Sequence, residues 1–224
     1  MGENILKLIK PADIITLFSA IAGFSSIILV IRGQFDGALV LILIAVIADG
    51  ADGAVARYSG YGVLGANLDS LADVISFGVA PSVAAFVYLG WPSGIFAGLF
   101  LACGMLRLAR FNVAGKKDGF EGIPITSGGF IVALFLLVKD YIPYVGPAFI
   151  FLLVIVSVLM VSTIDYPKLK NPVVLVPVVL VLVLDIAVFY LGYLNIVKIA
   201  SLILLVFVLA YVLSPLGKRF YGNK

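Results

Sequence analysis

The sequence contains no histidine and a single cysteine, and these two shortages exclude several common kinds of site. Without histidine there can be no histidine-bound zinc and no catalytic triad built on an imidazole. Cys103 has no second cysteine in the chain, so no disulfide can form within it. Charged residues are also scarce, at 12%. The basic ones are dispersed between apolar runs and form no stripe, so we expect no nucleic-acid partner.

Hydrophobic residues make up 63% of the chain, and the mean hydropathy is +1.22. Apolar runs of about 20 residues recur, which is the length that an α-helix needs to cross a bilayer. A lipid-exposed segment must satisfy its own backbone hydrogen bonds, so these runs predict an all-α, polytopic transmembrane bundle. Because there is no internal repeat and no long linker, we expect residues 1–224 to form a single integral membrane domain.

The pattern predicts about eight spans, which follow a short amphipathic helix at residues 4–10 that lies on the membrane surface. The predicted spans are 12–31, 38–57, 64–89, 92–113, 124–137, 146–164, 173–191 and 195–214. With this arrangement, twelve of the fifteen lysines and arginines fall on one side of the membrane. The positive-inside rule then predicts that both termini face the cytoplasm, with the chain in the cell membrane.

One polar stretch, DGADGAVARYSGYGVLGANLDSLAD at residues 49–73, interrupts two of these spans at the cytoplasmic side. It contains Asp49, Asp52, Asp69 and Asp73. Helical residues three or four positions apart share a face, so the first two aspartates project together, as do the last two. The short turn between them makes the helices antiparallel neighbours, which would bring all four carboxylates together. Because an ionised side chain in a bilayer costs roughly 3 kcal/mol or more, such a group needs compensation.

Carboxylate oxygens at this density suit hard divalent cations, Mg²⁺ or Mn²⁺ with Ca²⁺ as a third option, and four of them could hold two ions. Two such ions can clamp a phosphate and activate an attacking oxygen. Gly53 and Gly65 would let a bulky ligand approach the backbone, and Arg57 offers a fixed cation for phosphate. The alternative is a cation transporter with an acidic gate. It is disfavoured because the carboxylates are expected at one membrane depth and do not line a path.

The pattern Asp49-x-x-Asp52-Gly53-x-x-Ala56-Arg57, then seven residues, then Gly65-x-x-x-Asp69-x-x-x-Asp73 resembles the signature of the CDP-alcohol phosphotransferase family. The resemblance implies a membrane enzyme of the EC 2.7.8 class, expected to be a homodimer, that moves a phosphatidyl-type group from a CDP-linked lipid to an alcohol and releases CMP. It implies that the four aspartates bind metal and that Asp73 is also the catalytic base. By the same resemblance, the CDP moiety would contact Asp52, Gly53, Ala56, Arg57, Gly65 and Asp69.

Three further segments, 68–81, 107–113 and 119–125, resemble the phosphatidylserine synthase and archaetidylserine synthase branch of that family. The resemblance favours L-serine as the acceptor, with inositol phosphate, glycerol phosphate or another alcohol as alternatives. Arg107 and Arg110 could bind the serine carboxylate, although arginines here also suit positive-inside anchoring. Ser76, three residues after Asp73, and Asn112 could line the acceptor pocket, or could simply form hydrogen bonds between helices.

Overall fold

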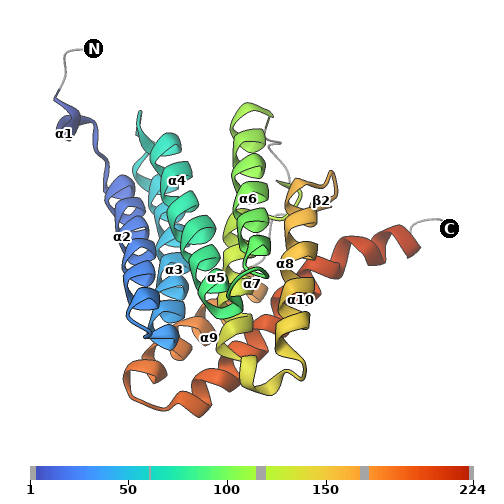
Figure 1. Cartoon of the computed structure of the whole chain (residues 1–224). Helices are drawn as coiled ribbons and strands as arrows, with labels where there is room; N and C mark the ends of the chain where they lie inside the picture. The colour runs from blue at the N-terminus through green and yellow to red at the C-terminus, as the bar shows by residue number, and fades with distance from the viewer. Residues whose placement is uncertain (1–3, 61, 115–119, 167–171, 222–224) are drawn as a thin grey trace.

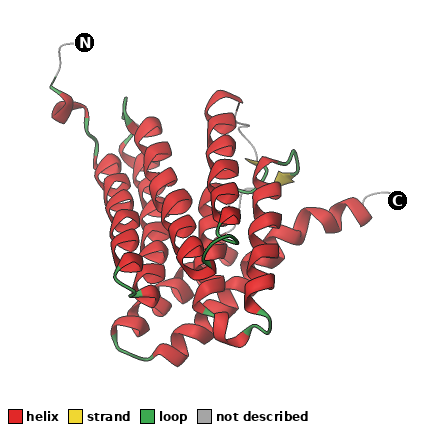
Figure 2. Cartoon of the chain, in the orientation of Figure 1, coloured by secondary structure: helices red, strands yellow, loops and turns green. Residues whose placement is uncertain are grey.

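The structure, a computed structural model, describes residues 4–60, 62–114, 120–166 and 172–221. Over these residues the chain is a bundle of helices that run beside one another, which confirms the predicted all-α class (Figures 1 and 2). The helices are α1 (Ile5–Leu8), α2 (Pro11–Ile31), α3 (Phe35–Ser59), α4 (Gly65–Asp73), α5 (Ala80–Leu89), α6 (Ile95–Ala114), α7 (Ile125–Leu137), α8 (Val145–Val161), α9 (Pro172–Tyr190) and α10 (Leu194–Tyr221).

Short irregular elements join some of these helices. A π-helical segment, η1 (Val74–Val79), connects α4 to α5 without a break, so the helix predicted over 64–89 contains a wider turn that the sequence pattern did not reveal. A 3₁₀ turn, η2 (Lys139–Tyr141), follows α7. The two-residue strands β1 (Phe120–Glu121) and β2 (Asp165–Tyr166) pair antiparallel and link the end of α6 to the end of α8.

Among the described residues, five helical stretches are long and apolar enough to cross a membrane: 11–31, 35–59, 65–89, 95–114 and 194–215. Apolar helices at 125–137, 145–161 and 175–190 are shorter. Every predicted span therefore corresponds to an apolar helix, and the chain has the lengths and composition of an integral membrane protein. The predicted surface helix corresponds to the four-residue α1, whose side chains are largely exposed.

The short helix α7 occupies the middle of the bundle. Its thirteen residues are apolar on every side and most are buried, as expected for a helix surrounded by others. It packs against α3, α6, α8, α10 and η1. At 1.5 Å per residue it is about 20 Å long, shorter than the hydrocarbon core of a bilayer, and the neighbouring helices cover it.

The segment that follows Asp73 is held tightly between two helices. A Cβ on Gly23 of α2 would lie 2.6 Å from the Cα of Ser76, and a Cβ on Gly129 of α7 would lie 2.8 Å from the Cα of Phe77. Because both residues are glycines, α2 and α7 can pack directly against η1. In addition, the Ser76 hydroxyl donates a hydrogen bond to the Ser19 carbonyl at 2.8 Å. These contacts fix the start of the segment to which Asp73 is attached.

We call the end of the bundle where α2 and α4 begin and where α3 and α6 end the site end, and the opposite end the far end (Figure 1). Ion pairs tie elements together at the far end. Lys198 Nζ lies 2.5 Å from Asp140 Oδ2, and Lys139 Nζ lies 3.9 Å from Asp36 Oδ1. Between the ends, the fully buried carboxyl of Asp185 in α9 accepts a hydrogen bond from Ser201 of α10 at 2.7 Å. This hydrogen bond joins α9 to α10.

Candidate active site

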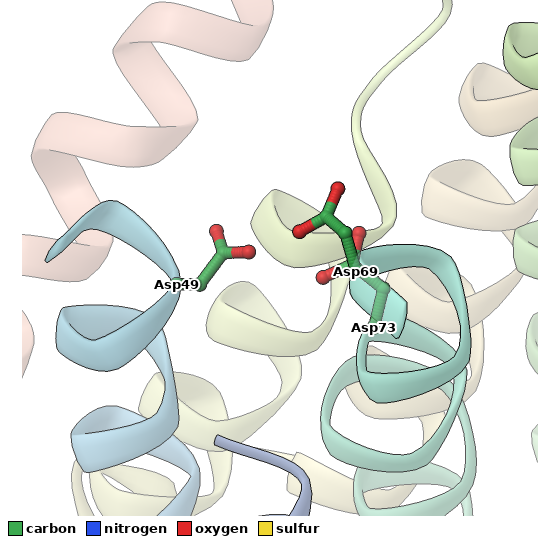
Figure 3. Close-up of side chains that lie close together, drawn as sticks. All are labelled: Asp49, Asp69 and Asp73. Atoms are coloured by element: carbon green, nitrogen blue, oxygen red, sulfur yellow. The ribbon is translucent and has the colours of Figure 1, made fainter. Parts of the chain in front are cut away.

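Three carboxylates face one another at the site end (Figure 3). Asp49 projects from the last part of α3, while Asp69 and Asp73 project from the same face of α4. One carboxylate oxygen from each residue lies within 4.8 Å of the other two. Asp73 is buried and the other two are half-buried. Like charges this close repel unless they take up protons or a cation neutralises them.

The fourth predicted ligand, Asp52, lies outside this group of three. It is only 6% exposed, and its Oδ2 accepts a hydrogen bond from the Thr16 hydroxyl of α2 at 2.5 Å. Asp52 therefore lies beside the group of three, and its role as a fourth metal ligand stays a prediction. The reason is geometric, because residues three apart on α3 diverge by a fraction of a turn and Asp52 turns toward α2.

A cavity of about 320 Å³, which we call the α2–α4 cavity, opens between α2, α3 and α4. The turn before α4 approaches Asp13 closely there. A Cβ on Gly62 would lie 2.9 Å from Asp13 Oδ2, and one on Gly65 would lie 3.2 Å from Oδ1. Asp13 itself accepts a hydrogen bond from the Lys10 amide at 2.7 Å, so it caps α2 as well as lining the cavity. The lining residues are Ala12, Asp13, Thr16, Asp52, Gly53, Ala56, Gly62, Gly65, Ala66 and Asp69.

The residues predicted to contact CDP mostly lie in this cavity. Asp52, Gly53, Ala56, Gly65 and Asp69 are among its lining residues. Arg57 is the exception, since its side chain is exposed and is not part of the lining.

A second cavity, of about 200 Å³, adjoins the first at Asp69, and we call it the α4–α6 cavity. Arg107 lines it from α6 and is only 5% exposed. Its guanidinium carbon lies 5.1 Å from the centre of the Phe111 ring, a cation–π arrangement that holds the charge in the same wall. The lining residues are Asp49, Asp69, Ser70, Asp73, Arg107, Leu108, Phe111, Pro124 and Thr126. This cavity thus combines the three facing carboxylates with a buried cation.

The four residues predicted for acceptor binding have different surroundings. Arg107 lines the α4–α6 cavity, and Asn112 donates a hydrogen bond at 2.9 Å to the lining residue Ser70. Ser76 and Arg110 line neither cavity, and Ser76 makes the hydrogen bond between helices that was its alternative interpretation. Ser76 is fully buried with its hydroxyl on Ser19, because the π-helical turn after Asp73 rotates it away from the face expected for a regular α-helix. Arg110 binds backbone carbonyls at the end of α8 and is not part of the lining.

Thr16 and Thr126 are site residues that the sequence reasoning did not identify. Thr16 supports Asp52, and Thr126 forms part of the wall near Arg107. A signal for Thr16 was present: Asp13, Thr16 and Ser19 recur every three residues and mark a polar face in an otherwise apolar span. No comparable pattern surrounds Thr126, because it begins a helix after a loop.

An apolar groove of about 290 Å³ lies on the neighbouring surface between α2, α3 and α9. Its lining residues are Ile15, Phe18, Ile44, Ile47, Ala48, Val183 and Ile186. Ala48 immediately precedes Asp49, so the groove reaches the residue next to the facing carboxylates. An apolar groove of this kind suits a hydrocarbon chain.

The donor set of the site fits a hard divalent cation. The three facing residues offer carboxylate oxygens from two rigid helices, and oxygen is the ligand that Mg²⁺, Mn²⁺ and Ca²⁺ prefer. Partial burial and mutual repulsion make a bound cation the natural way to keep all three ionised.

A family model described as CDP-alcohol phosphatidyltransferase matches residues 10–220. The chain is 39% identical over 177 residues to an archaetidylserine synthase of Methanothermobacter thermautotrophicus, covering 75% of this chain and 74% of the relative. It is 38% identical over 175 residues to a CDP-diacylglycerol–serine O-phosphatidyltransferase of Methanocaldococcus jannaschii, covering 76% and 80%. A Helicobacter pylori protein of the same name is 37% identical over 171 residues, covering 71% and 72%.

Proposed function

The chain belongs to the CDP-alcohol phosphatidyltransferase family, and on that premise we propose that it transfers a phosphatidyl-type group from a CDP-linked lipid to the hydroxyl of L-serine. CMP is the second product. The names of the relatives support serine as the acceptor, since they are serine O-phosphatidyltransferases and an archaetidylserine synthase. The lipid carries a diacylglycerol or a dialkylglycerol phosphate.

One observation carries this proposal: the three facing carboxylates line the α4–α6 cavity, which adjoins the α2–α4 cavity at Asp69, and an apolar groove lies beside them. A membrane lipid with a large anionic headgroup needs all of these parts. The lipid tail requires the groove and the nucleotide requires one cavity. The small acceptor, a separate substrate, requires the other cavity. A cation path across the bilayer would instead place carboxylates at several depths.

The α2–α4 cavity is the proposed place for CDP. Gly53, Ala56 and Gly65 lie in its wall, so the nucleotide can approach the backbone closely. Asp52 and Asp69 complete that wall as proposed nucleotide contacts. Arg57, exposed on the last turn of α3, is proposed to pair with a phosphate at the mouth of the cavity.

Two divalent cations, Mg²⁺ or Mn²⁺, bound by Asp49, Asp69, Asp73 and, from the signature, Asp52, would neutralise the diphosphate and align it for attack. Asp73 takes the proton from the serine hydroxyl while the serine oxygen bonds to the lipid-side phosphorus. The bond between that phosphorus and the CMP oxygen breaks, and CMP leaves with the electron pair. Arg107 is proposed to hold the serine carboxylate across the α4–α6 cavity.

The membrane arrangement proposed with this function has eight crossings, the site end in the cytoplasm and α1 on the membrane surface. The basic residues support this orientation: Arg57, Arg107 and Arg110 lie toward the site end, whereas Arg32 and Lys139 lie at the far end. A single domain is proposed because the sequence has no internal repeat and no long linker, and the homodimer is proposed from the family resemblance.

The test supplies purified protein with a CDP-lipid and Mg²⁺ or Mn²⁺, and offers serine, inositol phosphate and glycerol phosphate as separate acceptors. Both a diacyl and a dialkyl CDP-lipid are used, and each reaction is repeated with a chelator. We expect serine-dependent CMP release and a serine-headed lipid, both abolished by chelation. Turnover with another alcohol but not with serine would contradict the acceptor, and CMP release that survives chelation would contradict the role of the aspartates.

A further inference from the structure

Arg110 makes an unusual set of contacts one helical turn beyond Arg107. Its two terminal guanidinium nitrogens lie 2.7–3.2 Å from four backbone carbonyl oxygens. Three of these belong to the end of α8, at Met160, Val161 and Ser162, and the fourth to Glu121 of β1. One nitrogen serves three of the four oxygens, so at least one of its hydrogens is shared.

The three carbonyls at the end of α8 need donors because no later turn of the helix supplies backbone N–H groups to them. A cation at this position also opposes the negative end of the helix dipole. The planar fork of arginine can reach several oxygens in fixed directions, whereas a lysine ammonium acts as a point charge. Arg110 therefore caps α8 from a different helix and joins α6, α8 and β1 at one place.

The joint continues directly into the wall of the α4–α6 cavity. Gly122, at φ +70°, lets β1 lie against the end of α8, because a Cβ there would lie 2.8 Å from the Leu159 carbonyl and 3.0 Å from the Arg110 guanidinium. The Ile123 amide then donates to the Leu159 carbonyl at 3.2 Å. Pro124 follows and lines the cavity, as does Thr126.

The wall is also anchored from its other side. Ile125 is fully buried, and its side chain fills the space over Gly104 of α6, where an added Cβ would lie 2.8 Å from its Cδ1. The segment between Glu121 and Thr126 is thus held at two places, by the Arg110 joint and by the Ile125 side chain. Loss of that joint would let Pro124 and Thr126 move relative to Arg107 and the facing carboxylates.

We propose that Arg110 is a positioning residue that sets the shape of the acceptor cavity by clamping the end of α8 to the segment 121–126. The inference rests on the proposed function, because the α4–α6 cavity is the acceptor site only if that function holds. Arg110 does not bind the acceptor. It sets the distance across the cavity between Thr126 and Arg107.

The test compares Arg110→Ala and Arg110→Lys with the wild-type protein and with Arg32→Ala, an exposed arginine at the far end. Loss of hydrogen bonds from a charged group predicts a rise of about tenfold or more in the acceptor KM of Arg110→Ala, with the CDP-lipid KM nearly unchanged. Arg110→Lys should lie between that variant and the wild type, and Arg32→Ala should match the wild type. Equal changes in both KM values would overturn the proposal.

Amide hydrogen exchange supplies a readout that does not depend on catalysis. The Gly122 and Ile123 amides donate to carbonyls that follow or end α8. We expect their exchange to accelerate in Arg110→Ala while exchange in α2 stays the same, and unchanged exchange at both amides would overturn the clamp. If Arg110→Ala does not fold, Arg110→Lys carries both measurements, and a lysine variant identical to the wild type in both is the contradicting result. A wild-type protein that releases no CMP with any alcohol would refute the proposed function, and the exchange experiment would still decide the clamp.

Discussion

Aspartates at the two ends of the bundle have opposite surroundings. At the far end, Asp36 and Asp140 are more than 40% exposed, and each faces a lysine. At the site end, Asp49, Asp69 and Asp73 are buried or half-buried, and they face one another. Ion pairs like those at the far end contribute little to stability, since water already solvates both partners. Facing carboxylates are unfavourable unless they take up protons or a cation neutralises them.

The difference separates a structural use of charge from a chemical one. At the far end the charges are satisfied within the chain and hold the η2 turn against α10. At the site end the arrangement is completed only by something from outside the chain, which is what a substrate and metal site requires. Substitutions at the site end should therefore change turnover much more than stability, and substitutions at the far end should do the opposite.

The largest effect is expected from Asp73→Asn. Asparagine keeps the shape of the side chain but can neither accept the hydroxyl proton nor offer an anionic ligand, so kcat should fall by about a thousandfold or more. Binding of the CDP-lipid should remain measurable, because the α2–α4 cavity does not include this residue. CMP release and CDP-lipid binding are measured side by side, with Asp140→Asn as the far-end control. An Asp73→Asn variant with turnover within tenfold of the wild type would remove Asp73 as the base.

A smaller effect is expected from Thr16→Val, which preserves shape and removes the hydroxyl that donates to Asp52. A hydrogen bond to a charged group contributes about 1.5–3 kcal/mol, so kcat/KM for the CDP-lipid should fall by about tenfold or somewhat more. The acceptor KM should hardly change. Thr163→Val, outside both cavities, is the matched control. If the acceptor KM rose instead, Asp52 would belong to the other cavity.

The smallest effect is expected from Asp140→Asn. The hydrogen bond from Lys198 and the charge of Lys139 hold the pKa of Asp140 below its ordinary value. A lowered pKa stabilises the fold above the unfolded value of about 4, and this contribution is lost as the pH falls through the folded value. Because the pair is exposed, the substitution should lower the unfolding free energy by less than about 1 kcal/mol at pH 7. Thermal unfolding at several pH values should show the difference disappearing in acid, and a difference that grows in acid would contradict the sign.

Much of the fold could be predicted from the sequence because the bilayer leaves few alternatives to apolar helices. Each of the eight predicted spans coincides with an apolar helical stretch, five of them long enough to cross a membrane among the described residues, and Asp69 and Asp73 share a face as their spacing indicated. The short turn after Arg57 predicted antiparallel helices with Asp49 close to Asp69 and Asp73, and this prediction is confirmed. These features depend on local periodicity and on short connections, which a single sequence contains.

What could not be predicted depends on contacts between distant segments or on irregular backbone. The surroundings of Ser76 depend on the π-helical turn of η1 and on Ser19 and Gly23 of α2, which lie far from it in the chain. Nothing near Arg110 in the sequence reveals that the end of α8 lies beside it. The spacing of the aspartates alone does not show that the Thr16 hydroxyl of α2 donates a hydrogen bond to Asp52.

The most direct test of the central claim is Mn²⁺ binding to the purified protein, measured by calorimetry for the wild type, Asp69→Asn and Asp140→Asn. If the facing carboxylates are a metal site, the wild type binds Mn²⁺ saturably, and Asp69→Asn weakens that binding by about tenfold or more. Asp140→Asn, at the far end, should bind as the wild type does. A wild-type protein without saturable binding, or an Asp69→Asn variant that binds as tightly, would contradict the account.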